Sequence, residues 1–205
     1  IALVGSIVAS SSRGPSFSFN AIKPEIGAPG ASVSAIAGSG DESDAFGGTS
    51  GAAPMVSGSA ALVIAARPGL APRDVKALLV NTADDNIQTN PATLPGVLAP
   101  ITRIGGGEVR VNKAVAAKTA VWAADDQNPA LSFGYHAITA DRTFGKTVVV
   151  RNYSNSARTY TITPKFRYAD DAASGAVTPV APATITVPAN GRRSFRIELK
   201  VDAEK

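Results

Sequence analysis

A long apolar stretch with no polar face is the feature that most limits what this chain can fold into. From Ala53 to Ala66 every residue is small or apolar. A helix of this kind has no side suited to water, so it is buried in a core or in a membrane. Arg67, Pro68 and Gly69 end the stretch. We therefore predict a helix over residues 53–66 that is buried all round.

A second helix is predicted to begin at Pro72, because proline suits the first helical position. Apolar and small residues follow at i, i+3, i+4 and i+7 spacing, which indicates one buried face: Val75, Leu78, Leu79 and Thr82. Residues up to Lys118 are also rich in Gly, Ala, Ser and Pro. This part of the chain has the character of an α/β domain.

The period of the pattern changes to two beyond about Ala120. Apolar and charged residues alternate strictly over residues 195–201, and β-branched residues fill residues 147–150, 159–162 and 184–187. Short strands separated by turns favour an all-β antiparallel sandwich. Residues 122–126 fit neither period. We place the boundary just before them, which gives domains at residues 1–118 and 119–205.

Composition excludes several classes of function. The chain has 205 residues and no cysteine, which rules out disulfides, thiolate metal sites and a cysteine nucleophile. The net charge of +4 is spread thinly, without a basic run between aromatics, so we expect no nucleic-acid partner. No apolar run reaches the roughly 18 residues that span a membrane. Met55 is the only methionine and the chain opens with Ile1 in an apolar run, so we expect a longer parent protein.

Ser50 is the candidate nucleophile. The segment 47–54, Gly-Gly-Thr-Ser-Gly-Ala-Ala-Pro, stands directly before the apolar helix and places the Ser50 hydroxyl at its N-terminus. Free N–H groups and the helix dipole favour a developing oxyanion there by roughly 0.3–1 kcal/mol. A seryl nucleophile also needs a base. The residues alone leave a second interpretation open, in which Ser50 only caps the helix and the glycines only form its entry turn.

Residues 48–58 resemble the nucleophile motif of the subtilases, the subtilisin-like serine proteases: Gly-Thr-Ser-x-Ala-x-Pro followed by a helix. Four further segments resemble family landmarks in the same order: residues 11–15, 22–30, 77–83 and 105–114. The resemblance implies a subtilisin-like α/β fold, here the C-terminal portion of a three-layer domain with a parallel sheet. Gly51 replaces the usual Met, and Gly47-Gly48 replaces the commoner Ser-Gly or Asn-Gly.

The resemblance also implies roles. Ser50 would be acylated and its N–H would be an oxyanion donor, Thr49 would support the oxyanion hole, and Phe46, Gly47 and Gly48 would shape the substrate cleft. The family's catalytic Asp, His and oxyanion Asn precede the serine and have no counterpart in this chain. Loss of the base costs about a million-fold in kcat, so we expect the chain alone to be nearly inert.

The implied parent is therefore a secreted or cell-surface endopeptidase that acts on proteins or peptides. The upstream remainder of the catalytic domain would be the partner of this chain. The rival hypothesis is a non-catalytic pseudoprotease or interaction scaffold that presents the sandwich.

Two other groups of polar residues need assignment. Ser50, Asp84 or Asp85, and His136 follow the chain order of an α/β-hydrolase triad, but the nucleophile elbow of that class is missing, so we expect His136 at the surface. Carboxylates of an acidic loop offer oxygen ligands of the kind Ca²⁺ prefers: Asp41, Glu42 and Asp44. We expect a solvated loop and no cofactor.

The β module resembles a fibronectin type III-like domain in residues 146–152 and 160–163. That resemblance implies a module that braces the catalytic domain or helps to position large substrates.

Overall fold

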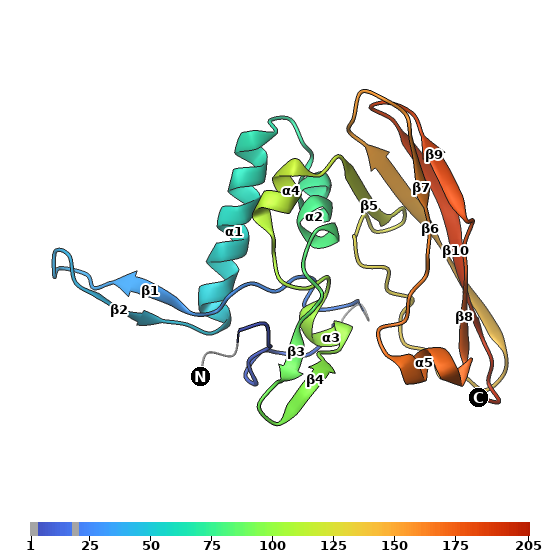
Figure 1. Cartoon of the computed structure of the whole chain (residues 1–205), viewed down its shortest axis with the longest axis horizontal. Coiled ribbons are helices and arrows are strands. Elements are labelled where there is room, and N and C mark those ends of the chain that lie inside the picture. Colours follow the sequence, from blue (N-terminus) through green and yellow to red (C-terminus); the bar gives the residue numbers. More distant parts are fainter. Residues whose placement is uncertain (1–3, 18–20) are drawn as a thin grey trace. The chain divides into compact units, whose positions relative to one another are not determined.

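The structure, a computed structural model, describes residues 4–17 and 21–205 (Figure 1). Ile1 and the next two residues of the N-terminal apolar run lie outside the described residues. The described residues form two compact units. The first comprises Ile22–Ala116 with the residues up to Pro15, and the second comprises Ala117–Lys205 with a short segment after Pro15. The division falls two residues before the predicted boundary.

The first unit contains helices and two β-hairpins. Its elements, in chain order, are β1 (Ser32–Ala35), β2 (Ser43–Phe46), α1 (Thr49–Ala66), α2 (Pro72–Asn81), β3 (Gln88–Asn90), β4 (Leu94–Leu98), α3 (Ile101–Ile104) and α4 (Val111–Ala116). Helices α1, α2 and α4 pack against one another. Their buried residues form most of the core: Val63, Val75, Ala77, Leu78, Leu79, Val80 and Ala114.

Helix α2 confirms the predicted amphipathic pattern. Pro72 is at the start of the helix, and the Ala71 N–H donates to the Asp74 carboxylate at 3.2 Å. The face with Val75, Leu78 and Leu79 is buried. Burying one leucine stabilises a fold by about 1.5–3 kcal/mol, so packing rather than intrinsic propensity holds this ten-residue helix.

Helix α1 forms as predicted but is not buried all round. Only Gly51, Ser59 and Val63 are buried, whereas Leu62 is 57% exposed and Ile64 is 52% exposed. The prediction was wrong for this chain because its own elements cover only one side of the helix. The prediction that no apolar run has membrane length was also wrong: by length and composition alone, the 18 residues of α1 are enough to cross a membrane. Mostly buried core helices of soluble proteins, and signal sequences, can have the same length and composition.

The predicted parallel sheet is not formed by the described residues of the first unit. Both hairpins, β1–β2 and β3–β4, are antiparallel, and parallel pairing is limited to two isolated bridges, Ser6 with Gln88 and Gly27 with Glu108. Parallel strands need crossover connections and several neighbours to make a ladder. In this chain the segments that run parallel to one another are joined by one isolated bridge each and form no ladder.

Residues 25–27, which precede β1, are bonded to residues much later in the first unit. The Gly27 N–H donates to the Gly107 carbonyl at 2.8 Å, and the Val109 N–H donates to the Gly27 carbonyl at 2.9 Å. The mostly buried Glu25 carboxylate pairs with Lys76 of α2 at 2.8 Å. These contacts fix the path of the chain toward Gly30.

The second unit is built on antiparallel strands. Four of them form one sheet in the order β5 (Thr119–Ala123), β6 (Arg142–Asn152), β10 (Arg192–Val201) and β8 (Val177–Val180). Two more, β7 (Arg158–Thr161) and β9 (Thr184–Val187), pair separately, and α5 (Ala169–Ser174) precedes β8. The predicted alternation in β10 is confirmed. A complete fibronectin-like sandwich stays a prediction.

Strand β5 corrects the interpretation of residues 122–126 as a patternless boundary. Ala120, Trp122 and Ala123 are all buried, so side chains that point to both faces of the sheet are apolar. A strand buried on both faces shows no alternation of apolar and polar residues. The loss of alternation at residues 122–126 was therefore misread as a boundary, although β5 includes the first two of these residues.

A buried amide joins β6 to the end of β9. Asn152 is 0% exposed, and its Nδ2 lies 2.8 Å from the Ser156 carbonyl, 3.3 Å from the Val187 carbonyl and 3.1 Å from the Pro188 carbonyl. Its Oδ1 accepts from the N–H and the hydroxyl of Ser154 at 2.9 and 2.6 Å. One side chain thus satisfies polar groups of two loops.

Candidate active site

Ser50 is exposed to solvent. It lies at the junction between β2 and α1, two elements that follow one another in Figure 1. Strand β2 ends at Phe46, Gly47 and Gly48 form the turn, and Ser50 is the second residue of α1. Gly48 has φ 77° and ψ −161°, a conformation open almost only to glycine. The glycine therefore makes the abrupt change from strand to helix possible.

The capping interpretation of Ser50 is wrong. The N-cap residue is Gly48, and no side chain donates or accepts a capping bond. The first helical bonds run from the Gly51 and Ala52 N–H groups to the Gly48 carbonyl, at 3.0 and 3.2 Å. Within the described part of the chain, neither the N–H nor the hydroxyl of Ser50 has a hydrogen-bond partner. Both groups are available to a ligand.

The electrostatic setting of this turn favours negative charge. The backbone dipoles of α1 place partial positive charge at its N-terminus, and no acidic residue lies in the first turn to compensate it. Thr49 is exposed beside Ser50, and Phe46 is 42% exposed at the end of β2. The five predicted site residues therefore share one accessible turn, and a tetrahedral oxyanion formed at Ser50 would be stabilised there.

A further residue lies against the turn that the sequence alone did not place there. The Gly30 carbonyl oxygen occupies the space in which Gly51 would carry a β-carbon. The sequence signal for such a contact is weak, since it consists only of glycines in segments 47–51 and 28–30.

His136 lies where the sequence predicts, at the surface of the second unit. Its Nε2 is 2.7 Å from the Phe133 carbonyl, and its ring stacks on Phe144 with centroids 4.3 Å apart. Asp84, in the first unit, accepts from the Asn86 N–H at 3.2 Å and from Arg110 at 3.0 Å. Those bonds, the Asn86 N–H first, lower the pKa of Asp84. Each side chain is engaged locally, which argues against a hydrolase triad.

The acidic residues before the nucleophile lie around the tip of the β1–β2 hairpin. Asp41 and Glu42 are exposed in the connection, and Asp44 is in β2 rather than in a loop as predicted. The Asp44 carboxylate accepts from the Ala45 N–H at 2.7 Å. Among residues 4–17 and 21–205, no group of three or more His, Cys, Asp or Glu side chains gathers in a way that would hold a metal ion.

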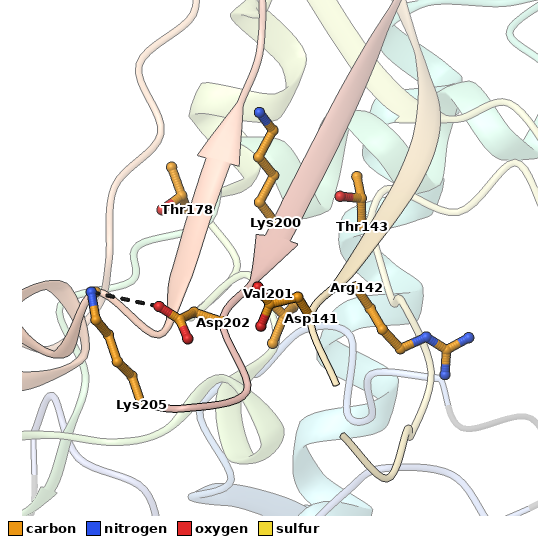
Figure 2. A pocket seen from close by; sticks show the side chains of 9 residues that line it. Asp141, Arg142, Thr143, Thr178, Lys200, Val201, Asp202 and Lys205 are labelled. Carbon is orange, nitrogen blue, oxygen red and sulfur yellow. Dashed lines mark ion pairs between the residues drawn. The ribbon is translucent and has the colours of Figure 1, made fainter. Parts of the chain in front are cut away.

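The second unit has a shallow hollow of about 380 Å³, which Figure 2 shows from close by. It is lined by Asp141, Arg142, Thr143, Gly175, Thr178, Lys200, Val201, Asp202 and Lys205. Its carboxylates serve the C-terminal turn: Asp141 accepts from the Ala203 N–H at 2.9 Å, and Asp202 pairs with Lys205 at 3.7 Å. The lining includes no serine, cysteine or histidine.

Comparison with known proteins identifies the family of the chain. A sequence model of the subtilase family matches residues 3–135, well over half of the chain. Minor extracellular protease Vpr of Bacillus subtilis (strain 168) is 28% identical over 203 residues, 95% of this chain and 23% of that protein. Subtilisin-like protease SBT3.16 of Arabidopsis thaliana is 42% identical over 86 residues, 42% of this chain and 11% of that protein. The chain thus spans about a quarter or less of the length of these curated relatives.

Proposed function

This chain belongs to the subtilase family, and we propose that it carries the nucleophile of a serine endopeptidase. One observation carries the proposal: Ser50 is exposed at the start of α1 with its hydroxyl and its N–H both unbonded. In a structural cap the hydroxyl would bond to the helix backbone. Because the Ser50 hydroxyl and N–H are both unbonded, the hydroxyl could attack a carbonyl carbon and the N–H could donate to the oxyanion that forms.

The reaction would proceed through an acyl-enzyme. The Ser50 Oγ attacks the carbonyl carbon of the scissile peptide bond, and its proton passes to a base. The Ser50 N–H donates to the oxyanion, and Thr49 supports the oxyanion hole. The base then gives its proton to the amine, which leaves past Phe46. Water then releases the acyl group. Gly47 and Gly48 leave room for the substrate backbone, and these steps need no cofactor.

We propose that the base, its orienting carboxylate and a further oxyanion donor come from the upstream part of the catalytic domain. The exposed apolar side chains of the first unit support this partner. Met55, Leu62 and Ile64 of α1, and Val33 of β1, are each at least 42% exposed. Covering such side chains stabilises by about 25 cal/mol per Å² of apolar surface removed from water. A domain that covers α1 would therefore be held next to Ser50.

The place of action and the role of the β module are further proposals. The name of the Bacillus relative describes an extracellular protease, which supports a secreted or cell-surface parent. The second unit would brace the catalytic domain or help to position large protein substrates, as a fibronectin type III-like module would. Deletion of residues 119–205 should then lower stability or activity on proteins, and no change in either would contradict this role.

Labelling with a fluorophosphonate tests the proposed reaction in the full-length parent. The probe should modify Ser50, and Ser50→Ala should abolish both the modification and the digestion of a protein substrate. A parent that is not labelled at Ser50, or a Ser50→Ala variant that digests protein as fast as the wild type, would contradict the proposal. Either result would favour the non-catalytic scaffold.

A further inference from the structure

The net charge of the chain lies entirely in its second unit. Residues 117–205 carry 12 Lys and Arg against 8 Asp and Glu, whereas residues 1–116 carry 8 of each kind. The second unit therefore accounts for the whole net charge of +4. An excess of one sign attracts partners of the opposite sign, so the arrangement of these cations matters.

Three arginines gather where β6 meets the start of β10. Arg192 and Arg193 are the first residues of β10 and are both exposed, and Arg151 of β6 lies directly opposite Arg192 in the register. We call these three residues the arginine corner. Arg192 and Arg193 also line a shallow hollow of about 270 Å³, together with Val149 and Ser194. Among the described residues, this lining contains no carboxylate.

The arginine corner has no counter-charge within the part of the chain that the structure describes. None of the ion pairs in residues 4–17 and 21–205 involves an arginine of the corner, whereas Arg196 of β10 pairs with Glu198 at 2.9 Å. The Arg151 guanidinium instead lies over the Tyr153 ring, 5.3 Å from its centroid. Like charges directly opposite each other destabilise a sheet, so Arg151 and Arg192 weaken the strand pair that carries them. A local rule broken without compensation is expected at a functional site.

We propose that the arginine corner binds acidic segments of protein substrates. Planar guanidinium groups bind carboxylates through paired, charge-assisted hydrogen bonds. Val149 adds an apolar wall to the hollow, against which the methylene groups of a glutamate can pack. A nucleic acid fits less well, because proteins bind single strands by stacking bases on aromatic side chains, and the described lining of the hollow includes no aromatic residue. The proposal rests on the proposed function, since it assigns a class of substrate to the protease.

Binding of an oligo-glutamate peptide to the full-length parent tests the arginine corner. The parent carries Ser50→Ala so that the peptide is not digested, and fluorescence anisotropy gives Kd. We expect Arg192→Gln and Arg193→Gln each to raise Kd about two- to fivefold, and the double variant to raise it about 5- to 25-fold. Lys165→Gln is the matched control, because it removes the same charge from an exposed residue outside the corner, and its Kd should change less than about twofold.

The melting temperature separates binding from a structural role. Arg192→Gln should not melt at a lower temperature than the wild type, because the substitution ends the repulsion between Arg192 and Arg151. A fall in melting temperature that accounts for the loss of binding would overturn the proposal. Should Arg192→Gln not fold, the Kd of Arg193→Gln against that of Lys165→Gln decides the question.

Three results of the binding experiment would also overturn the proposal. The first is no binding of oligo-glutamate by the parent with an intact corner. The second is an equal rise of Kd in Arg192→Gln and in Lys165→Gln, which would reflect net charge alone. The third is tighter binding of inorganic polyphosphate than of oligo-glutamate at the same corner, which would make it a site for phosphate polyanions.

Digestion by the active parent separates this proposal from the proposed function. Two protein substrates are compared that differ only in a tail of glutamates or of glutamines. The double variant, Arg192→Gln with Arg193→Gln, should raise KM for the glutamate-tailed substrate about 5- to 25-fold and leave kcat unchanged, without effect on the glutamine-tailed substrate. If KM rises equally for both substrates or for neither, the arginine corner does not recruit substrates, and the proposed function stands. If the wild type digests neither substrate, the proposed function fails, and the measured Kd values still decide whether the corner binds acidic segments.

Discussion

Replacement of Asn152 by alanine tests how the second unit is held together. Asn152 is fully buried and contacts the carbonyls of Ser156, Val187 and Pro188, together with two groups of Ser154. Alanine makes none of these bonds. A buried polar group left unsatisfied costs about 1–3 kcal/mol.

The size of the loss follows from which groups water can reach. The bond to the Val187 carbonyl is buried, so the full cost applies there, whereas the bonds to Ser154, Ser156 and Pro188 are only partly buried. One full cost and four partial costs give a loss of about 3–5 kcal/mol in the free energy of unfolding. Few single substitutions exceed this.

Urea unfolding of this chain measures the effect, with the fluorescence of its single tryptophan as the signal. Trp122 lies in β5 of the same unit and is 4% exposed, so it reports the unfolding of that unit. Asn155→Ala is the matched control, because Asn155 is exposed, and its change should stay within about 0.5 kcal/mol. A loss below about 1 kcal/mol for Asn152→Ala would refute the reasoning.

Four shorter predictions concern the site and its surroundings. This chain alone should hydrolyse a peptide at least about 10⁵-fold more slowly than the full-length parent, because it lacks the base, and comparable turnover would contradict that. His136→Ala in the parent should leave kcat/KM unchanged, whereas a tenfold loss would revive the hydrolase order. The pKa of Asp84 is lowered in the folded state, so its contribution to stability is present above the ordinary pKa near 4 and is lost as the pH falls through the lower folded value. The free energy of unfolding in urea should therefore fall less between pH 7 and pH 3 in Asp84→Asn than in the wild type. Identical pH profiles of the two proteins would contradict a stabilising role of the Asp84 carboxylate. Melting of the chain should be the same in EDTA and in millimolar Ca²⁺, and a Ca²⁺-dependent rise that Asp44→Asn removes would show that a calcium site exists.

Sequence patterns predicted those elements of the fold that have one solvent-exposed face and one face packed against the protein. Helix α2 buries one side and strand β10 half-buries one side against its own unit, so the spacing of Leu78 and Leu79, or of Phe195 and Ile197, reflects the structure directly. Strand β5 escaped prediction because both of its faces are buried. The apolar composition of α1 predicted the helix but not its exposure, since a sequence does not say which partner covers a side chain.

The candidate site divides in the same way. Ser50, Thr49 and the glycines before them were predictable, because they are contiguous and stand directly before an apolar helix. The contact of Gly30 was not, because a meeting of backbone atoms leaves no periodic pattern of side chains. Its only trace in the sequence is a residue without a β-carbon at positions 30 and 51.

The uncovered sides of α1 bear on how such a protein is made. The N-terminal part of a polypeptide emerges from the ribosome first. The proposed upstream part of the catalytic domain would therefore have emerged before α1. A helix with Leu62 and Ile64 turned to water adheres readily to other apolar surfaces. We therefore expect the isolated chain to bind the dye ANS and to self-associate during expression. Translation in one chain with the proposed upstream part of the catalytic domain should suppress both.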